Sequence, residues 1–487
     1  MTTKTKKSVS RRNFLILGSA AVGTAAIAGT TYSILNQHQN GVPGAEPQRL
    51  VSKNGILDIN LVAAVTKKVI DGKTVNVLTY NGQTPGPTWV AKPGDEVHVA
   101  FTNKLGESTN LHTHGLHVSP EGNSDNPFIE IRDGETFKYK YQVPHTHKEG
   151  TFWYHPHHHG MAAKQVFGGL YGAIIIENEQ TPQVEADRVL VISDIAFSND
   201  GNIAGVNAMS KMMGREGSLL LVNGGIQPEM QAKSGAIERW RIVNACTSRN
   251  LDLTVLGAAA KILGLDGNKY SELRDLNRVT IAPGNRLELL VTLSNRTASL
   301  NYTTVPHPDA MGMMGSSQTY ADYPLLTVKP NSQVASVTSA AAVFTSPLDL
   351  RKETVMVKRT FKLWMPGMNN MMSMMGSGIE GQFKINGQAF DMNRIDTVTS
   401  KGSVEEWTLV NESTMNHPFH LHVWDQQILS TPVGIVADVE YQDVVNVPAK
   451  SQVVVRVKFD DFSGMSVYHC HILDHEDLGM MGIINAI

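Results

Sequence analysis

The chain has 487 residues, a formal net charge of −3 and only two cysteines. Its length exceeds what one hydrophobic core usually organises, so two or three domains are expected. The charge balance excludes the basic footprint of a nucleic-acid-binding protein, and small molecules are the expected partners. If Cys470 binds a metal, Cys246 has no partner for an intramolecular disulfide.

The N-terminus resembles a twin-arginine export signal. Three lysines precede Arg11 and Arg12, and an apolar run rich in Gly and Ala follows from 14 to 34. Ala26-Ile27-Ala28 is a candidate cleavage site, although the run is long enough to stay as a membrane anchor. We expect the signal to be cleaved and the protein to be periplasmic or otherwise exported through the twin-arginine machinery. No later stretch is long and apolar enough to span a membrane, so a soluble mature body is expected.

After a polar linker over 36–48, short alternating strands and Gly, Pro and Asn turns predict an all-β fold. A threefold repeat supports it: an Asn-Gly pair, then a Gly, then a strand that ends at an Asn. The copies contain Asn81, Gly94 and Asn103; Asn223, Gly235 and Asn244; and Asn386, Gly402 and Asn411. The sequence therefore predicts a signal and linker over 1–48 and three Greek-key β-sandwich domains over 49–180, 181–345 and 346–487.

The repeat also locates candidate metal ligands. The first and third copies each hold two His-x-His pairs, namely His112/His114, His155/His157, His420/His422 and His469/His471. Counted from the repeat, the middle copy has Leu253 and Val255 at the first pair and Tyr-Thr-Thr-Val over 302–305 at the second. Domain 2 is therefore predicted to be a metal-free spacer, and His307 just beyond it a loop histidine.

Each His-x-His pair on a strand presents both imidazoles to one face, about 7 Å apart. Eight imidazoles from domains 1 and 3 can then converge across the interface between these domains. One metal cannot use eight imidazoles, whereas three copper ions can, and imidazole is a suitable copper ligand.

The stretch from His469 to Met481, HCHILDHEDLGMM, points to a second kind of site. Cys470, His475 and Met480 supply three parts of the set of two His, one Cys and a weak axial Met that binds blue copper. His417 is the best candidate for the fourth ligand. Because Cys470 is bonded to His469 and His471, an electron entry site would be connected through the backbone to the histidine cluster. The alternative is a solvated, histidine-rich terminal strand.

These four motifs resemble those of the multicopper oxidases, the group that includes laccases, bilirubin oxidase and bacterial copper-efflux oxidases. The resemblance covers essentially the whole mature chain and implies three cupredoxin-like domains and four copper ions. It assigns type 1 copper to His417, Cys470, His475 and Met480, type 2 copper to His112 and His420, and the type 3 pair to His114, His155 and His471 on one side and His157, His422 and His469 on the other.

The resemblance also implies a mechanism. A reductant gives single electrons to type 1 copper, Cys470 conducts them to the histidine cluster, and dioxygen is reduced there to water. Because this reaction consumes protons, nearby carboxylates must relay them. Glu476 matches the family's relay acid. Asp125 is a candidate for the second acid, with a turn-forming Asp as the alternative.

Methionines bear on the substrate. The chain has 21, and six lie in one segment: Met365, Met368, Met371, Met372, Met374 and Met375. Flexible packing is one interpretation. The interleaved Asn, Ser and Gly instead favour an exposed Cu(I) site, because thioethers are soft ligands. Met415 and the segment 385–393 are similar to the copper-efflux oxidases. However, Asn370 and Ser413 stand where those enzymes place acidic ligands, and the Met-rich segment here is shorter and lacks His.

The sequence thus predicts a monomeric exported oxidase that passes electrons from Cu(I), phenols or aromatic amines to dioxygen. One alternative is a general laccase or bilirubin-oxidase-like enzyme without a cuprous role. The others are a copper store, which would not need a trinuclear cluster, and a copper-free scaffold like the division-associated relatives, which lack the ligands that this chain retains.

Overall fold

The structure, a computed structural model, describes residues 44–179, 181–303, 322–337, 340, 344, 347–367 and 379–487. The described residues belong to one compact unit. The predicted export signal and His307 lie outside them, as do Met368, Met371, Met372, Met374 and Met375. In the described ranges, every helix is too short or too polar to span a membrane.

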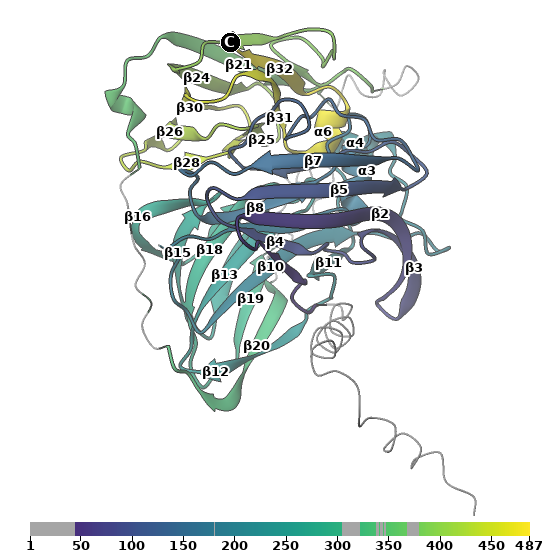
Figure 1. Cartoon of the computed structure of the whole chain (residues 1–487), viewed down its shortest axis with the longest axis vertical. Helices are drawn as coiled ribbons and strands as arrows, with labels where there is room; N and C mark the ends of the chain where they lie inside the picture. Colours follow the sequence, from purple (N-terminus) through teal and green to yellow (C-terminus); the bar gives the residue numbers. More distant parts are fainter. Residues whose placement is uncertain are drawn as a thin grey trace, which may run out of the picture. The chain divides into compact units, whose positions relative to one another are not determined.

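The described strands confirm the all-β prediction. They form six sheets that fall into three consecutive pairs along the chain, as the colours of Figure 1 show. Each pair lies inside one predicted domain range, although the domain limits themselves stay a prediction. Burial alternates along strands such as β5 (Glu96–Lys104) and β30 (Gln452–Phe459). This period of two is expected when one face of a sheet packs on a core.

The first pair of sheets supplies half of the histidines. One sheet has the order β1 (Arg49–Val51), β4 (Thr88–Ala91), β9 (Gly172–Ile176), β8 (Gly150–His155) and β6 (His112–His114). The other has the order β3 (Lys73–Tyr80), β2 (Ile56–Ile70), β5 and β7 (Thr136–Gln142). Leu57 of one sheet and Ile174 of the other belong to the same buried cluster, so the two sheets share a core.

The second pair of sheets has the same plan. One sheet has the order β11 (Leu219–Val222), β10 (Ala186–Ile195), β13 (Ile237–Asn244), β18 (Arg286–Thr292), β15 (Ala259–Leu265) and β16 (Asn268–Asp275). The other has the order β12 (Glu229–Ser234), β20 (Asp322–Val334), β19 (Ala298–Thr303), β14 (Leu251–Leu256) and β17 (Val279–Ile281). Trp240 and Leu253 lie in the core between them.

The third pair of sheets carries the remaining ligands. One sheet has the order β22 (Lys384–Ile385), β21 (Val357–Trp364), β24 (Ser403–Asn411), β30, β26 (Gln426–Thr431) and β27 (Gly434–Ile435), with β28 (Tyr441–Gln442) beside β26. The other has the order β23 (Thr397–Thr399), β32 (Met481–Ala486), β31 (Gly464–Cys470), β25 (His417–Leu421) and β29 (Val444–Val447).

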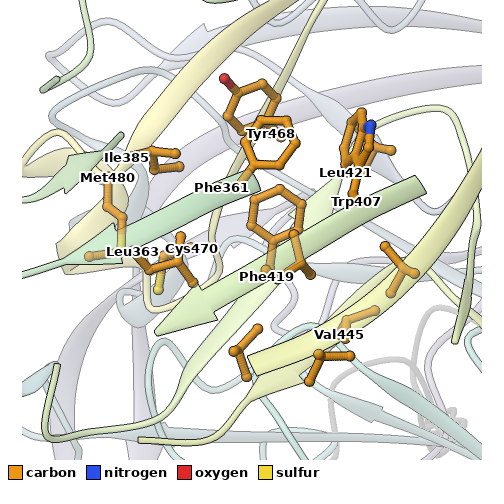
Figure 2. Packing of buried hydrophobic residues seen from close by; sticks show 14 of the residues in the cluster. Phe361, Leu363, Ile385, Trp407, Phe419, Leu421, Val445, Tyr468, Cys470 and Met480 are labelled. Carbon is orange, nitrogen blue, oxygen red and sulfur yellow. The ribbon is translucent and has the colours of Figure 1, made fainter. Parts of the chain in front are cut away.

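Cys470 and Met480 belong to the core of this third pair. The core includes Trp407 and Phe419, whose ring centroids lie 6.4 Å apart and which come from opposite sheets. Figure 2 shows Cys470 and Met480 at one end of the cluster, and the Cys470 N–H donates to the Met480 carbonyl at 3.0 Å. Both sulfurs therefore lie in an apolar environment, which suits soft ligands.

The repeat found in the sequence recurs in the backbone. Asn81, Asn223 and Asn386 have φ of +53°, +50° and +52°, and each is followed by a glycine that also has positive φ. Two successive positive φ values define the turn that Asn-Gly favours. The asparagine that ends each repeat strand donates from Nδ2 to a distant carbonyl: Asn103 to Ile131 at 2.8 Å, Asn244 to Ile281 at 3.1 Å and Asn411 to Val447 at 2.9 Å.

Strand pairing corrects one count made from the sequence. Thr113, Leu253 and Leu421 each lie opposite a tyrosine on the neighbouring strand, so they are equivalent positions of the three copies. The residues directly before them in the chain are then equivalent as well. The middle-copy equivalent of His112 and His420 is thus Asp252, one residue earlier than predicted. Its carboxylate accepts from Arg278 at 3.1 Å. Counting residues missed this shift because the connection from the repeat asparagine to the next strand is one residue shorter in the middle copy.

Short helices complete the site region: α3 (Ala162–Phe167), α4 (Ala208–Met213) and α6 (Leu473–Asp477), besides the 3₁₀ turn η2 (Leu350–Lys352). Figure 1 shows α3, α4 and α6 gathered in one region, and residue contacts join α6 to both of the others. Asp477 of α6 accepts from the backbone N–H of Gly160 at 2.8 Å and of Ala163 at 2.9 Å. The helix that bears His475 is thereby tied to the segment that follows His157.

Candidate metal centre

Two strand pairs place the eight histidines. In the first, β6 lies antiparallel to β8 with His112 opposite His155; in the second, β25 lies antiparallel to β31 with His420 opposite His469. The second member of three of the pairs, His157, His422 and His471, lies just beyond its strand's end. Strand ends can turn toward a shared space, which brings histidines about 300 residues apart in sequence into contact.

The eight imidazoles are buried and meet in overlapping groups. The donor atoms within each of three groups lie no more than 4.8 Å apart: His112, His114 and His420; His114, His155 and His471; and His157, His422 and His469. The last two groups are the sets that the resemblance assigns to the type 3 pair. His114 stacks on His420 and His112 on His422, each with ring centroids 3.8 Å apart.

Hydrogen bonding on the outer side of the rings selects the nitrogen that faces inward. His155 Nδ1 lies 2.8 Å from the Pro156 carbonyl, and His420 Nδ1 lies 2.8 Å from the Asp443 carbonyl. A carbonyl only accepts, so these nitrogens carry the protons and leave each Nε2 with a free lone pair. An imidazole held in this way by its other nitrogen is typical of a metal ligand.

The inward nitrogens test whether a metal fits. Among the eight paired histidines, seven buried ring nitrogens have no hydrogen-bond partner: His112 Nε2, His114 Nδ1, His155 Nε2, His420 Nε2, His422 Nδ1 and both nitrogens of His471. Leaving one such group unpaired costs about 1–3 kcal/mol, so a concentration of them calls for a ligand that accepts lone pairs. Copper meets this requirement, because imidazole nitrogen is among its preferred donors.

The protonation state of the cluster agrees with metal binding. Burial lowers the pKa of His155 to about 3 and that of His420 to about 4. Burial, followed by the charge of neighbouring imidazoles, holds the pKa of His112, His422 and His469 well below the ordinary value. The rings are therefore neutral near pH 7, which is the form that binds a metal.

A second group contains the only cysteine of the third domain range. Cys470 Sγ lies 3.3 Å from His417 Nδ1 and 3.8 Å from His475 Nδ1, and all three residues are fully buried. His475 Nε2 donates to the Met212 carbonyl at 2.8 Å, which leaves its Nδ1 lone pair facing the sulfur. His417 Nε2 lies 2.7 Å from the Ser413 hydroxyl. Burial raises the pKa of the Cys470 thiol, so the thiolate forms here when a cation replaces the proton.

The two candidate relay acids lie against the histidine cluster. Asp125 Oδ2 is 2.9 Å from His112 Nδ1, and its Oδ1 accepts from the Thr113 N–H at 2.8 Å. Both of these side-chain contacts are thus with the strand that bears His112 and not with the turn that contains Asp125. Glu476 Oε2 lies 3.1 Å from His469 Nδ1, without the alignment of a hydrogen bond. Burial raises the pKa of Asp125 to about 7 and that of Glu476 well above its ordinary value.

The two methionines of the predicted Cu(I) site that the structure describes are not exposed as expected. Met365 and Met415 are only 7% and 1% exposed and belong, with Met212, to the core that holds Cys470. Met365 directly follows β21, and Met415 precedes β25, so both lie where strands of this core end. Polar neighbours in the sequence did not predict this burial, because the core is completed by residues far away along the chain.

Sequence patterns missed the residues that support the ligands. Asp443 contacts His114 Nε2 at 3.1 Å, and Arg286 pairs with Asp443. Arg215 and Asp474 form a buried ion pair beside His475. None of these pairs has a short or repeated spacing, so no sequence signal identifies them.

Comparisons with known proteins agree with this site. Two models described as multicopper oxidase match residues 62–181 and 360–486, which hold every predicted copper ligand and together span just over half of the chain. A multicopper oxidase of Staphylococcus aureus is 28% identical over 88% of this chain and 90% of its own length. Relatives at 24–25% identity include a laccase of Bacillus subtilis, a bilirubin oxidase of Albifimbria verrucaria and the cell division protein FtsP of Proteus mirabilis.

Two solved structures extend the similarity to the fold. A multicopper oxidase from Campylobacter jejuni, described as a metallo-oxidase, has a TM-score of 0.77 at 29% identity and aligns over 91% of this chain and 96% of that one. A laccase-like multicopper oxidase from Ochrobactrum sp., described as oxidising lignin model compounds and lignosulfonate, has a TM-score of 0.79 at 26% identity over 91% and 100%. The chain belongs to the multicopper oxidase family, and it is an oxidoreductase of that family.

Proposed function

We propose that the protein binds four copper ions and couples one-electron oxidation of Cu(I) and of small aromatic reductants to the reduction of dioxygen to water. The observation that carries this proposal is the set of buried, unpaired imidazole nitrogens beside a buried Cys-His-His group. Bound there, copper supplies single-electron acceptance at the cysteine group and dioxygen reduction at the histidine cluster.

The donor sets support a division into one ion and three. His417, Cys470 and His475 would hold type 1 copper, with Met480 as the axial ligand. The eight paired histidines would hold the other three ions, with His112 and His420 for type 2 copper and three histidines for each type 3 ion. Their nitrogens fall into several groups, two of which share His114, whereas a single ion would need one group of about four donors.

The chain itself links the two sites. Cys470 contributes its sulfur to one site, while the residues on either side, His469 and His471, contribute imidazoles to the other. The path between them follows covalent bonds and needs no contact across a gap. Asp125 and Glu476 lie beside the histidine cluster, where they would relay the protons that the reduction of dioxygen consumes.

The cuprous part of the proposal rests on Met365 and Met415. Their thioethers are soft donors in the same core as Cys470, and Met415 lies two residues before His417. The similar Campylobacter protein is described as a metallo-oxidase. The aromatic part rests on the similarity to laccases and to the Ochrobactrum enzyme.

Two alternatives differ in what they require. A general laccase would keep all the copper ligands but would not use the methionines. A copper-free scaffold, suggested by the similarity to FtsP, would need neither the copper ligands nor the methionines, and it leaves the unpaired imidazole nitrogens unexplained. We also propose export through the twin-arginine machinery to the periplasm, on the strength of the N-terminal motif.

Metal analysis tests the copper assignment. Purified, copper-loaded protein should contain about four ions per chain and show the intense blue absorption of a copper thiolate. A fully loaded preparation with a single ion would contradict the histidine cluster as a copper site.

Rates with Cu(I) and with a phenol test the substrate. Because Leu keeps most of the volume of Met but lacks sulfur, Met365→Leu with Met415→Leu should raise KM for Cu(I) and leave phenol oxidation unchanged. Met465→Leu is the matched control, because Met465 of β31 is an exposed methionine. A parallel fall in both activities would assign the two methionines to packing, and no change in either would favour the general laccase.

A further inference from the structure

The middle pair of sheets reaches the histidine cluster through Arg286. This residue begins β18, is fully buried, and directs both terminal nitrogens at the Asp443 carboxylate: Nη1 donates to Oδ1 at 2.6 Å and Nη2 to Oδ2 at 2.5 Å. A two-pronged guanidinium–carboxylate contact fixes the orientation of both planes. Asp443 lies between β28 and β29 in the third pair of sheets, so the contact joins two of the three predicted domains.

Asp443 in turn holds two predicted copper ligands by different atoms. Its Oδ1 lies 3.1 Å from His114 Nε2, and its backbone carbonyl accepts from His420 Nδ1 at 2.8 Å. His114 is thereby left with Nδ1 facing inward and His420 with Nε2, and both of these nitrogens are unpaired. The two rings stack with centroids 3.8 Å apart at an interplanar angle of 8°.

Further contacts hold Arg286 in place, among them a buried ion pair in which Nη1 lies 3.4 Å from Asp266 Oδ1. Nε donates to the Thr151 carbonyl at 3.1 Å, and Nη1 also donates to the Gly284 carbonyl at 3.2 Å. Gly284 packs so closely that a Cβ there would lie 3.0 Å from the ring of His471. A Cβ on Gly115 would overlap Arg286 and Asp443. Arg286 is therefore fully buried in a closely packed region.

We propose that Arg286 is a positioning residue for the trinuclear centre: acting through Asp443, it sets the ring orientation and the tautomer of His114 and the ring orientation of His420. The middle domain then contributes to the copper site without supplying a ligand, which goes beyond the spacer role predicted from the sequence. This inference rests on the proposed copper assignment of these histidines.

The test compares Arg286→Lys, Asp443→Asn and their combination with the wild type. Lys keeps the charge but cannot make the two-pronged contact. Loss of such a support typically weakens metal binding about 10- to 100-fold, so both single variants should release trinuclear copper at correspondingly lower chelator concentrations. Their type 2 electron paramagnetic resonance signal should also change, while the blue absorption at Cys470 stays. If Arg286 acts through Asp443, the combined variant should be no worse than the more severe single variant.

Arg239→Lys is the matched control. Arg239 is fully buried in the same sheet, and its guanidinium pairs with Glu149 and Glu288, neither of which is a predicted copper ligand. The Arg239→Lys substitution should therefore leave the type 2 signal unchanged. The proposal is overturned if Arg286→Lys keeps the wild-type signal and copper retention, if Arg239→Lys loses the same copper, or if the effects of Arg286→Lys and Asp443→Asn simply add. Should Arg286→Lys fail to fold, Asp443→Asn, which keeps the shape of the side chain but removes its charge and turns one acceptor into a donor, decides by the same two readouts. A wild type without type 2 copper would instead refute the copper assignment itself.

Discussion

Replacing Arg215 by methionine should destabilise the helix that carries His475. The Arg215 guanidinium contacts the Asp474 carboxylate of α6, with Nη2 at 2.6 Å from Oδ1 and Nε at 2.9 Å from Oδ2. The side chains are only 8% and 2% exposed. In the wild type, the Asp474 carboxylate also accepts from the backbone N–H of Arg215 at 2.9 Å. The variant keeps this hydrogen bond but loses the positive charge that compensates the burial of the carboxylate.

The expected cost is about 3–5 kcal/mol, the usual penalty for removing one partner of a buried ion pair. Methionine retains most of the apolar stem of Arg, so little of this cost arises from a cavity. Arg215→Met combined with Asp474→Leu should recover most of the stability, because replacing both partners by apolar groups of similar volume is often close to neutral.

Urea denaturation of the copper-free proteins, followed by tryptophan fluorescence, measures the change. In the copper-loaded proteins, retention of the blue absorption against a chelator reports on the Cys470 site. Arg456→Met is the control, since Arg456 and Glu406 form a partly exposed pair that should contribute less than about 1 kcal/mol. The reasoning is refuted if Arg215→Met costs less than the control, or if the combined variant loses as much as the two single variants together.

Three further changes test other parts of the site. Cys470→Ser should abolish the blue absorption and turnover while copper analysis falls by one ion per chain, because serine is a poor copper ligand; normal turnover would rule out Cys470 as the electron entry point. Met480→Leu should keep the colour and raise the type 1 reduction potential, and an unchanged potential would exclude Met480 as a ligand. Burial lowers the pKa of His117, but its hydrogen bonds to Asp461 and to the Val423 carbonyl outweigh burial and raise that pKa above the ordinary value of about 6.5. The stabilisation from His117 should thus be complete below about pH 6.5 and disappear as the pH rises through the folded-state pKa. The urea midpoints of wild type and His117→Gln should therefore converge with rising pH. A difference between the two midpoints that grows with pH would contradict this.

The sequence by itself determined which side chains could bind metal and how each is presented locally. His-x-His spacing places two imidazoles on one face of a strand, and His469-Cys470-His471 divides one strand end between two sites, because strand geometry repeats every two residues. The Asn-Gly pairs at Asn81, Asn223 and Asn386 likewise indicated their turns, since few other residues adopt positive φ easily. These properties depend on near neighbours in the chain.

Only the tertiary structure decided how distant segments combine. It placed Asp443 and Arg286 behind His114, buried Met365 and Met415 in the core of the third pair of sheets, and shifted the middle-copy strand by one residue. Each of these outcomes depends on contacts between residues tens to hundreds of positions apart. Such contacts are set by how the sheets pack against one another, and no local spacing in the sequence encodes that packing.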